Sequence, residues 1–245
     1  MLLKFSKTSD ATSKFVSIAV YGEPGIGKTT LAKTLGVADD RVLFLSADRG
    51  HISVCDKNFT MVHKLANDAE MAEFAAYVEA EAKAGKIDWV FVDGLDTMAD
   101  DLVERERAWE AKQDKPNQYG PYDRLYSKGR AFIMRIQGAA CNSLFTFQMA
   151  RDDKSATPYS FAFPGIKLND KLMAYFDNVL PMRLVTLVDG GKTITKRLLQ
   201  TRRDGGGDRQ YESKCRDPFK RIAAYEEPNI AALVEKMTKP AAPAV

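Results

Sequence analysis

The octapeptide from Gly22 to Thr29 constrains the fold of this chain more than any other feature. It reads Gly-Glu-Pro-Gly-Ile-Gly-Lys-Thr, in which four residues separate the first and last glycines and Lys-Thr follows directly. The apolar run 15–21 before it predicts a buried strand, and residues 30–35 after it predict the first turns of a helix. A strand, this glycine pattern and a helix, in that order, are typical of a phosphate-binding loop in an α/β fold.

The residue types of the octapeptide suit the binding of a polyphosphate. Glycines let backbone N–H groups approach the anion closely, and the positive end of the following helix adds to the same field. Lys28 would reach the β- and γ-phosphates, and the Thr29 hydroxyl would bind Mg²⁺. We therefore expect a nucleoside triphosphate with Mg²⁺ here, against the alternative of a glycine-rich turn with an incidental lysine. The expected nucleotide contacts are Gly22, Glu23, Pro24, Gly25, Ile26, Gly27, Lys28, Thr29 and Thr30.

The composition suits one intracellular domain. The 245 residues are 45% hydrophobic, which is enough for a sizeable core. We expect residues 1–238 to form a single domain and the Pro/Ala-rich residues 239–245 to be disordered. The sequence has no run of eighteen apolar residues, and its three cysteines predict reduced thiols. We therefore expect a cytoplasmic protein that contacts no membrane.

The distribution of charge is more informative than the net charge of +3. Residues 195–221 hold nine basic and four acidic side chains, whereas residues 96–114 hold seven acidic and three basic ones. The basic stretch is a candidate surface for a polyanion, and the alternative is an ordinary solvated face.

Strands and helices are predicted to alternate along the chain. Continuous apolar strands separated by helices predict an α/β fold with a mostly parallel central sheet flanked by helices. The turn at 189–191 predicts a β-hairpin, which adds antiparallel strands at one edge. Further strands are predicted at residues 42–45, 59–62, 89–92, 144–147, 178–188 and 193–199, and helices at 68–84, 97–112, 123–138, 168–176 and 229–237.

An aspartate follows one of these strands at the edge where ligands bind in such sheets. Asp93 ends an apolar strand, which is the position of the carboxylate that holds Mg²⁺ through water in nucleotide-binding folds. The alternative is a cap on the next helix, for which Asp96 and Thr97 are better placed. Gly94 follows Asp93, so the carboxylate that many ATPases place at this position must be sought elsewhere.

Two further residues are candidates for positioning the water that attacks the γ-phosphate. Asp48 follows the second strand and could orient this water and accept its proton; the alternative is a turn-forming aspartate before Gly50. Gln148 closes the fourth strand, where its amide could bond a γ-phosphate oxygen or the water and act as a switch. The alternative is a buried amide that only satisfies the backbone. With Lys28 and Asp93, these residues form the predicted catalytic set.

A long loop with aromatic and basic residues follows Gln148. Its three rings alternate over five residues, and basic side chains lie on both sides. Rings that stack on bases and cations that neutralise phosphates are typical of a groove for single-stranded nucleic acid. The alternative is a short strand whose rings pack on the core. The candidate contacts are Arg151, Lys154, Tyr159, Phe161, Phe163 and Lys167.

Together these features resemble the RecA-type P-loop NTPase core, and in particular the small bacteriophage RecA-like single-strand annealing ATPases. The resemblance covers residues 16–221 and rests on the phosphate loop, Asp48, Asp93, Gln148 and the aromatic-basic loop. It implies a Mg²⁺-dependent, DNA-stimulated ATPase that binds single-stranded DNA and anneals or recombines complementary strands. It also implies a ring or filament of identical subunits, with a single-strand-binding protein as a further candidate partner.

Subunits of this family hold ATP between neighbours, and the resemblance therefore implies residues that reach a neighbour's phosphates. The candidates are the basic residues near the final strands, Lys196, Arg197, Lys214 and Arg216. Two departures from the family pattern stand out. Asp48 is one methylene shorter than the glutamate of RecA, and no segment of the length of RecA's oligomerisation helix precedes the first strand.

Three other functions are open alternatives. A helicase-loading or remodelling ATPase would carry a carboxylate beside Asp93 and a separate helical lid domain. A small-molecule kinase would carry an arginine-rich lid, for which Arg202 and Arg203 are the available candidates. A nucleotide-dependent interaction module would show negligible turnover.

Overall fold

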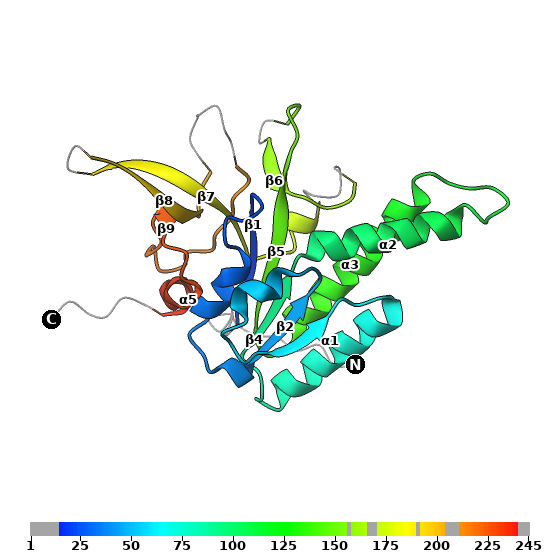
Figure 1. Cartoon of the computed structure of the whole chain (residues 1–245), viewed down its shortest axis with the longest axis horizontal. Helices are drawn as coiled ribbons and strands as arrows, with labels where there is room; N and C mark the ends of the chain where they lie inside the picture. Colours follow the sequence, from blue (N-terminus) through cyan, green and yellow to red (C-terminus); the bar gives the residue numbers. More distant parts are fainter. Residues whose placement is uncertain (1–14, 156–157, 166–170, 190–191, 204–210, 240–245) are drawn as a thin grey trace.

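The computed structural model describes residues 15–155, 158–165, 171–189, 192–203 and 211–239. A nine-stranded sheet forms its centre, in the order β3-β2-β4-β5-β1-β7-β8-β9, with β6 paired to β5 (Figure 1). The strands are β1 (Ser17–Gly22), β2 (Val42–Ser46), β3 (Thr60–His63), β4 (Trp89–Asp93), β5 (Asn142–Arg151), β6 (Tyr159–Phe161), β7 (Asn178–Asp189), β8 (Lys192–Gln200) and β9 (Tyr225–Glu226). The helices are α1 (Asp68–Lys83), α2 (Leu95–Glu110), α3 (Gly120–Gly138) and α5 (Ile230–Thr238), with short 3-10 helices η2 (Thr29–Thr34), η3 (Asp39–Arg41) and η4 (Gly50–Val54).

The fold class predicted from the sequence is confirmed. Six strands, β3, β2, β4, β5, β1 and β7, pair in parallel, and β8 and β9 continue the sheet in antiparallel pairing at one edge. The predicted hairpin is β7 with β8, whose outermost pair joins Asp189 to Lys192. Part of the helix expected at 168–176 falls outside the described residues, and residues 171–173 are helical.

Strand β5 lies between β1 and β4 in the sheet. Gly22 at the end of β1 is in register with Gln148 on β5, and Phe145 on β5 is in register with Val92 on β4. Parallel strands end at the same edge of a sheet. The phosphate loop, Asp93 and Gln148 therefore meet at one edge, as expected from the sequence.

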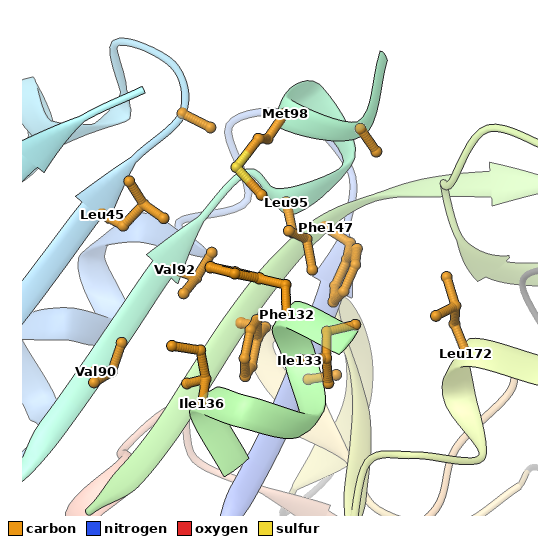
Figure 2. Close-up of a cluster of buried hydrophobic side chains, with 14 of the residues drawn as sticks. Leu45, Val90, Val92, Leu95, Met98, Phe132, Ile133, Ile136, Phe147 and Leu172 are labelled. Carbon is orange, nitrogen blue, oxygen red and sulfur yellow. The ribbon is translucent and has the colours of Figure 1, made fainter. Parts of the chain in front are cut away.

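Both faces of the sheet are covered, which explains why its strands are continuously apolar. Helices α1, α2 and α3 cover one face, and Figure 2 shows Phe132, Ile133 and Ile136 of α3 with Val90 and Val92 of β4. Elements η2 and α5 cover the other face. They supply Leu31, Ala32, Leu35, Ile230, Leu233 and Met237, which cluster with Ile18, Val20, Phe44 and Phe91 of the sheet.

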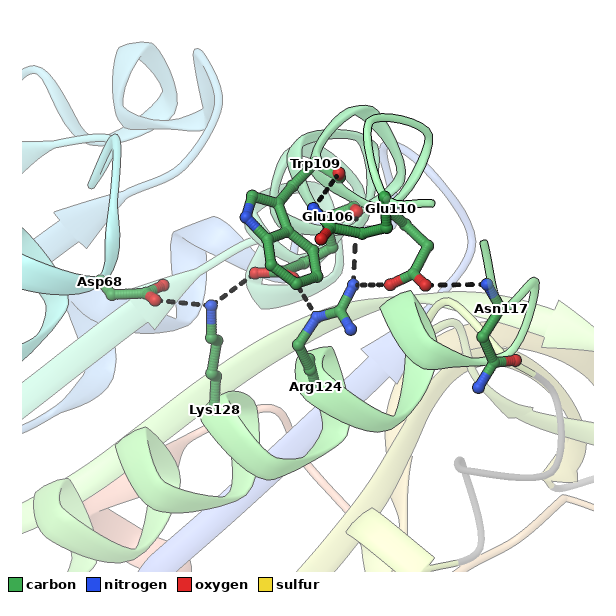
Figure 3. A network of polar contacts seen from close by, with 8 residues as sticks. Asp68, Glu106, Trp109, Glu110, Asn117, Arg124 and Lys128 are labelled. Atoms are coloured by element: carbon green, nitrogen blue, oxygen red, sulfur yellow. Dashed lines mark hydrogen bonds and ion pairs between the residues drawn. The ribbon is translucent and has the colours of Figure 1, made fainter. Parts of the chain in front are cut away.

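A network of ion pairs joins the three helices of the first face (Figure 3). Lys128 of α3 pairs with Asp68 of α1 at 2.6 Å and with Glu106 of α2. Arg124 of α3 pairs with Glu106 and, at 2.6 Å, with Glu110. The side chains of Glu106 and Glu110 are largely buried in this network, and the several pairs together fix how the helices are aligned. The acidic stretch of α2 thus faces cations of its own chain.

Two cysteines of the described chain, the buried Cys141 and the half-buried Cys215, have raised thiol pKa values. Burial raises the pKa of the Cys141 and Cys215 thiols to about 12, so both stay protonated near neutral pH. Cys55 is exposed, and all three are free thiols, as expected. Within the described ranges, no helix is long and apolar enough to cross a membrane. A cytoplasmic location stays a prediction.

Two helix starts differ from the sequence prediction. The segment after the phosphate loop, η2, is a six-residue 3-10 helix instead of the start of an α-helix. A helix this short adds little dipole to a phosphate site, so the loop and Lys28 must supply the attraction. Helix α2 begins at Leu95 and is capped by the backbone of Gly94, whose φ of +77° is left-handed. Asp96 therefore lies inside the first turn and is not the cap.

The rings of Phe161 and Phe163 belong to the core, which is the alternative that the sequence left open. Phe161 is fully buried and stacks on Phe147 at a centroid distance of 4.2 Å. Phe163 is 6% exposed and lies against Gly129 of α3, where a Cβ would be 3.2 Å from its ring. Neither ring is accessible to a nucleic-acid base in this structure. Their proposed stacking on DNA is therefore withdrawn.

Replacing Phe161 by Ala is expected to lower the free energy of unfolding by about 3–5 kcal/mol, because it leaves a cavity beside Phe147. Urea unfolding monitored by circular dichroism measures this change. Tyr119→Ala is a matched control, because this ring is 67% exposed and its loss should cost less than about 0.5 kcal/mol. If Phe161→Ala leaves the free energy of unfolding unchanged and weakens DNA binding, Phe161 belongs to a nucleic-acid-binding surface.

Candidate nucleotide-binding site

A cavity of about 370 Å³ lies at the carboxyl ends of β1, β2, β4 and β5. This is the edge where α/β sheets bind ligands. The phosphate loop forms one wall, and it is completed by residues at or just after the ends of β2 and β4, by residues within β5 and by Arg197 of β8. The lining residues are Pro24, Gly25, Gly27, Lys28, Thr29, Thr30, Asp48, Gly50, Ser53, Asp93, Gly94, Asp96, Thr146, Phe147, Gln148 and Arg197.

Two glycines of the loop adopt backbone angles that other residues avoid. Gly25 has a φ of +73° and Gly27 a φ of +100°. A Cβ on Gly27 would also lie 2.5 Å from Nη1 of Arg197, whose side chain would have to shift, so the backbone angle is the main reason for glycine at this position. The left-handed backbone angles of Gly25 and Gly27 therefore explain why glycines stand at these two positions of the motif.

Lys28 folds back onto its own loop. Its Nζ donates to the carbonyl oxygens of Gly22 and Glu23, both at 2.9 Å, and to Oε1 of Gln148 at 3.2 Å. The side chain is buried, and burial lowers its pKa, while Asp96, Asp93 and Asp48 act in the opposite direction. Lys28 thus lies between the loop and Gln148, where phosphate oxygens could replace the present acceptors.

Asp93 is a buried carboxylate whose two oxygens both accept hydrogen bonds. Thr29 donates to Oδ2 at 2.8 Å, and Thr146 of β5 donates to Oδ1 at 2.6 Å. Burial raises the pKa of Asp93, and these two hydroxyl bonds lower it again. Thr146 also accepts from the N–H of Gly94 at 2.9 Å. The sequence analysis missed Thr146, although its position two residues before Gln148 places it on the same side of β5.

The oxygen atoms around Gly50 suit a divalent cation. A Cβ on Gly50 would lie 2.5 Å from Oδ2 of Asp93, 2.8 Å from Oδ1 of Asp48 and 2.9 Å from Oγ1 of Thr29. Three oxygens therefore surround one point, and oxygen is the donor that Mg²⁺ prefers. Thr29 and Asp93, the two predicted ligands, fit this ion.

The carboxylates of Asp48 and Asp96 differ in their surroundings. Asp48 is exposed and accepts from the N–H of Gly50 at 2.6 Å, so it forms the turn that the alternative described, and it also lines the cavity. Asp96 is 5% exposed, and burial raises its pKa to about 6. The sequence analysis considered Asp96 only as a helix cap and missed its place in the cavity.

Gln148 connects the cavity to the aromatic-basic loop. Its side chain contacts Lys28, and its backbone carbonyl accepts from the N–H of Ala162 at 2.7 Å. Arg151 and Lys154 lie a few residues further on and are exposed, and Arg151 lies over the ring of Tyr159 at 5.7 Å. The half-buried Tyr159 stacks on Tyr211 at 4.6 Å. Lys167 falls outside the described residues.

The four basic residues predicted near the final strands have different contacts within their own chain. Arg197 lines the cavity of its own chain beside Gly27. Lys196 pairs with Glu227 at 3.5 Å, Arg216 pairs with Asp177 at 2.9 Å, and Lys214 donates to the carbonyl of Phe176 at 2.8 Å. Of the four, the structure brings Arg197 alone to the phosphate loop.

Comparisons with known proteins agree with this geometry. A family model described as "AAA domain" matches residues 14–210, which include the phosphate loop, Asp93 and Gln148. No curated protein sequence matches the chain. A solved structure described as a prototypical ATPase from the type III secretion system of pathogenic bacteria is similar, with 13% identity and a TM-score of 0.48.

That alignment covers 69% of this chain and 52% of the secretion ATPase, so the chain spans about half the length of that protein. Similarity at this level does not indicate a shared role. The family match extends over most of the chain and includes every residue that lines the cavity, Arg197 of β8 included. The chain therefore belongs to the AAA domain family and is a P-loop ATPase domain.

Proposed function

We propose that this ATPase binds single-stranded DNA and, as an oligomer, brings complementary strands together, with ATP controlling its grip. The observation that supports the proposal best is the unbroken strand β5, Asn142–Arg151. It carries Thr146 and Gln148 in the nucleotide cavity, and it ends at Arg151 in the exposed basic loop. One strand thus connects the nucleotide cavity with an exposed segment whose cations are Arg151, which pairs with Asp153, and Lys154. A polyanion would compete with Asp153 for Arg151.

Three hydrogen bonds strengthen this connection. The carbonyl of Gln148 accepts from Ala162, directly after β6, so a movement of Gln148 would pull on the far end of the loop. Tyr21, next to Gly22 of the phosphate loop, donates to the carbonyl of Tyr159 at 3.0 Å and to that of Glu212 at 2.6 Å. Gln148 and Tyr21, which flank the phosphate site, therefore both contact the segment 159–162. Switches of this kind couple a lost phosphate contact to a change in a loop.

Hydrolysis would proceed by in-line attack of water on the γ-phosphate. Lys28 would leave its backbone acceptors to hold the β- and γ-phosphates, and Gln148 would bond the water or a γ-phosphate oxygen. Thr29 and Asp93 would hold Mg²⁺, which when bound neutralises charge on the phosphates. Asp48 lines the same cavity and could orient the water. After hydrolysis and loss of the γ-phosphate, Lys28 would again donate to Gln148.

Lys28→Ala is expected to reduce the rate of ATP hydrolysis at least about 100-fold, because it removes the main cation facing the phosphates. A phosphate-release assay measures the rate, and a fluorescent ATP analogue measures binding. Lys33→Ala is the control, since Lys33 lies one turn further along η2 and pairs with Asp56 at 2.6 Å. Normal turnover in Lys28→Ala would refute the assignment of the site.

Replacing Arg151 and Lys154 together by Ala is expected to weaken binding of single-stranded DNA. Two lost phosphate contacts should reduce the slope of log K against log salt by about 1.4. Fluorescence anisotropy with labelled oligonucleotides at several salt concentrations gives this slope. The control replaces Lys112 and Lys115 by Ala. These two exposed lysines follow the end of α2, and their loss should leave the slope unchanged. If the wild-type protein binds no DNA with or without ATP, the annealing proposal fails while the ATPase remains.

Mixing two inactive variants distinguishes a role of Arg197 in its own cavity from a role at a neighbour's. If Lys28 and Arg197 serve the same site from one chain, a mixture of Lys28→Ala and Arg197→Ala subunits recovers no ATPase activity. We expect this result, because Arg197 lies beside Gly27 of its own chain. Recovery of activity on mixing would instead support the contact across a subunit interface that the resemblance implies.

A further inference from the structure

We infer that Asp96 accepts the proton of the water that attacks the γ-phosphate. This inference rests on ATP hydrolysis in the cavity, which is one part of the proposed function, and does not depend on DNA binding. Asp96 lines the cavity together with Lys28 and Gln148. Nothing in the family match assigns it a role, and the sequence pattern alone suggested only a helix cap.

The backbone brings Asp96 into the cavity. Strand β4 ends at Asp93, and the left-handed Gly94 turns the chain directly into α2. The N–H of Gly94 is held by Thr146, and this bond fixes the turn against β5. Asp96 in the first turn of α2 therefore lies on the cavity side of the helix, three residues after the predicted Mg²⁺ ligand.

One oxygen of Asp96 is uncommitted. The side chain is 5% exposed, and among the described residues its Oδ1 has no hydrogen-bond partner. A buried carboxylate oxygen without a donor is unfavourable, and such groups persist in proteins mainly where they serve a function. Water is a donor that fits a polar cavity of this size. Asp96 is thus prepared to accept a hydrogen bond, and then a proton, from water.

The other two carboxylates of the cavity lack this property. Both oxygens of Asp93 accept from threonine hydroxyls. Asp48 is exposed and has Oδ1 committed to the N–H of Gly50. Of the three aspartates that line the cavity, Asp96 is the one with a buried oxygen that lacks a hydrogen-bond donor.

The charges that face Asp96 suit a proton acceptor near neutral pH. Burial is the main effect and raises its pKa to about 6, while a backbone hydrogen bond from Gln148 and the charge of Lys28 limit the rise. Asp100, one turn further along α2, raises the pKa slightly. Asp93 and Asp48 share the cavity and face Lys28 as well. A base with a pKa just below the working pH is ionised and still accepts protons effectively.

The step conserves atoms and charge. The water oxygen forms a bond to the γ-phosphorus, and the bond from that phosphorus to the bridging oxygen breaks. The bridging oxygen leaves on ADP with the electron pair. The water proton moves to Oδ1 of Asp96, and the carboxylic acid later returns this proton to phosphate or solvent.

The principal test is Asp96→Asn, which keeps the shape of the side chain and removes the acceptor. We expect kcat to fall about 10²–10⁴-fold while the affinity for ADP stays within about threefold. In the wild type, kcat should rise with pH through about 6 and then level off, and this rise should disappear in Asp96→Asn. Asp100→Asn is the matched control on the same helix. It should keep the plateau of kcat and shift the rise to lower pH, because it removes a neighbouring negative charge.

A measurement without nucleotide tests the same carboxylate independently of activity. A ¹³C carboxyl resonance that titrates near pH 6 in the wild type should be absent in Asp96→Asn and should move to lower pH in Asp100→Asn. Thermal melting shows whether Asp96→Asn is folded, and we expect no loss of stability because a buried charge is removed.

Three outcomes are decisive. Unchanged kcat and pH profile in folded Asp96→Asn would overturn the inference while leaving the ATPase intact. If the rise of kcat with pH near 6 disappears in Asp48→Asn and remains in Asp96→Asn, then Asp48 and not Asp96 accepts the proton. A wild-type protein that binds ATP but does not hydrolyse it would instead overturn the proposed hydrolysis itself.

Discussion

The buried carboxylate of Asp93 is the contact on which the rest of the site depends. An ionised carboxylate inside a protein is stable only if its oxygens receive hydrogen bonds. Thr29 supplies one bond from the phosphate loop, and Thr146 supplies the other from β5. These two bonds tie β4, η2 and β5 together at one point. Because Thr146 lies two residues before Gln148 and also accepts a hydrogen bond from Gly94, the same point sets the positions of the Gln148 amide and of α2.

Much of the fold follows from local sequence patterns, because each central strand is apolar on both faces and each helix has a clear start or end. The phosphate loop was identifiable because its glycines serve backbone angles that few other residues adopt. Asp93 was identifiable because the parallel arrangement fixes where strand ends meet. Gln148 was expected to close its strand, but β5 continues to Arg151, and Gln148 reaches the site because it is in register with Gly22 at the end of β1. In these cases a short stretch of sequence contains the whole physical reason for the structure.

Other residues depend on contacts between distant parts of the chain, and their sequence neighbours give no signal of them. Asp96 resembles any aspartate near a helix start until Gly94 is seen to take the cap. Phe161 and Phe163 alternate along the sequence, as rings on the exposed side of a strand would. Both are buried because they pack against Phe147, Phe176 and Gly129, which their sequence neighbours do not reveal. Arg197 reaches the phosphate loop because β7 pairs with β1 and β8 pairs with β7, which brings together two residues that lie far apart in the sequence.

The self-contacts of Lys28 have a consequence for the cycle of the enzyme. All three ammonium protons already have acceptors within the protein, so ATP must compete with two carbonyls and an amide for the same cation. The gain on binding is the difference between two sets of bonds and is therefore moderate. Once the γ-phosphate has gone, the internal acceptors become the better competitors. In the proposed cycle, these internal acceptors would therefore favour release of ADP over tight retention.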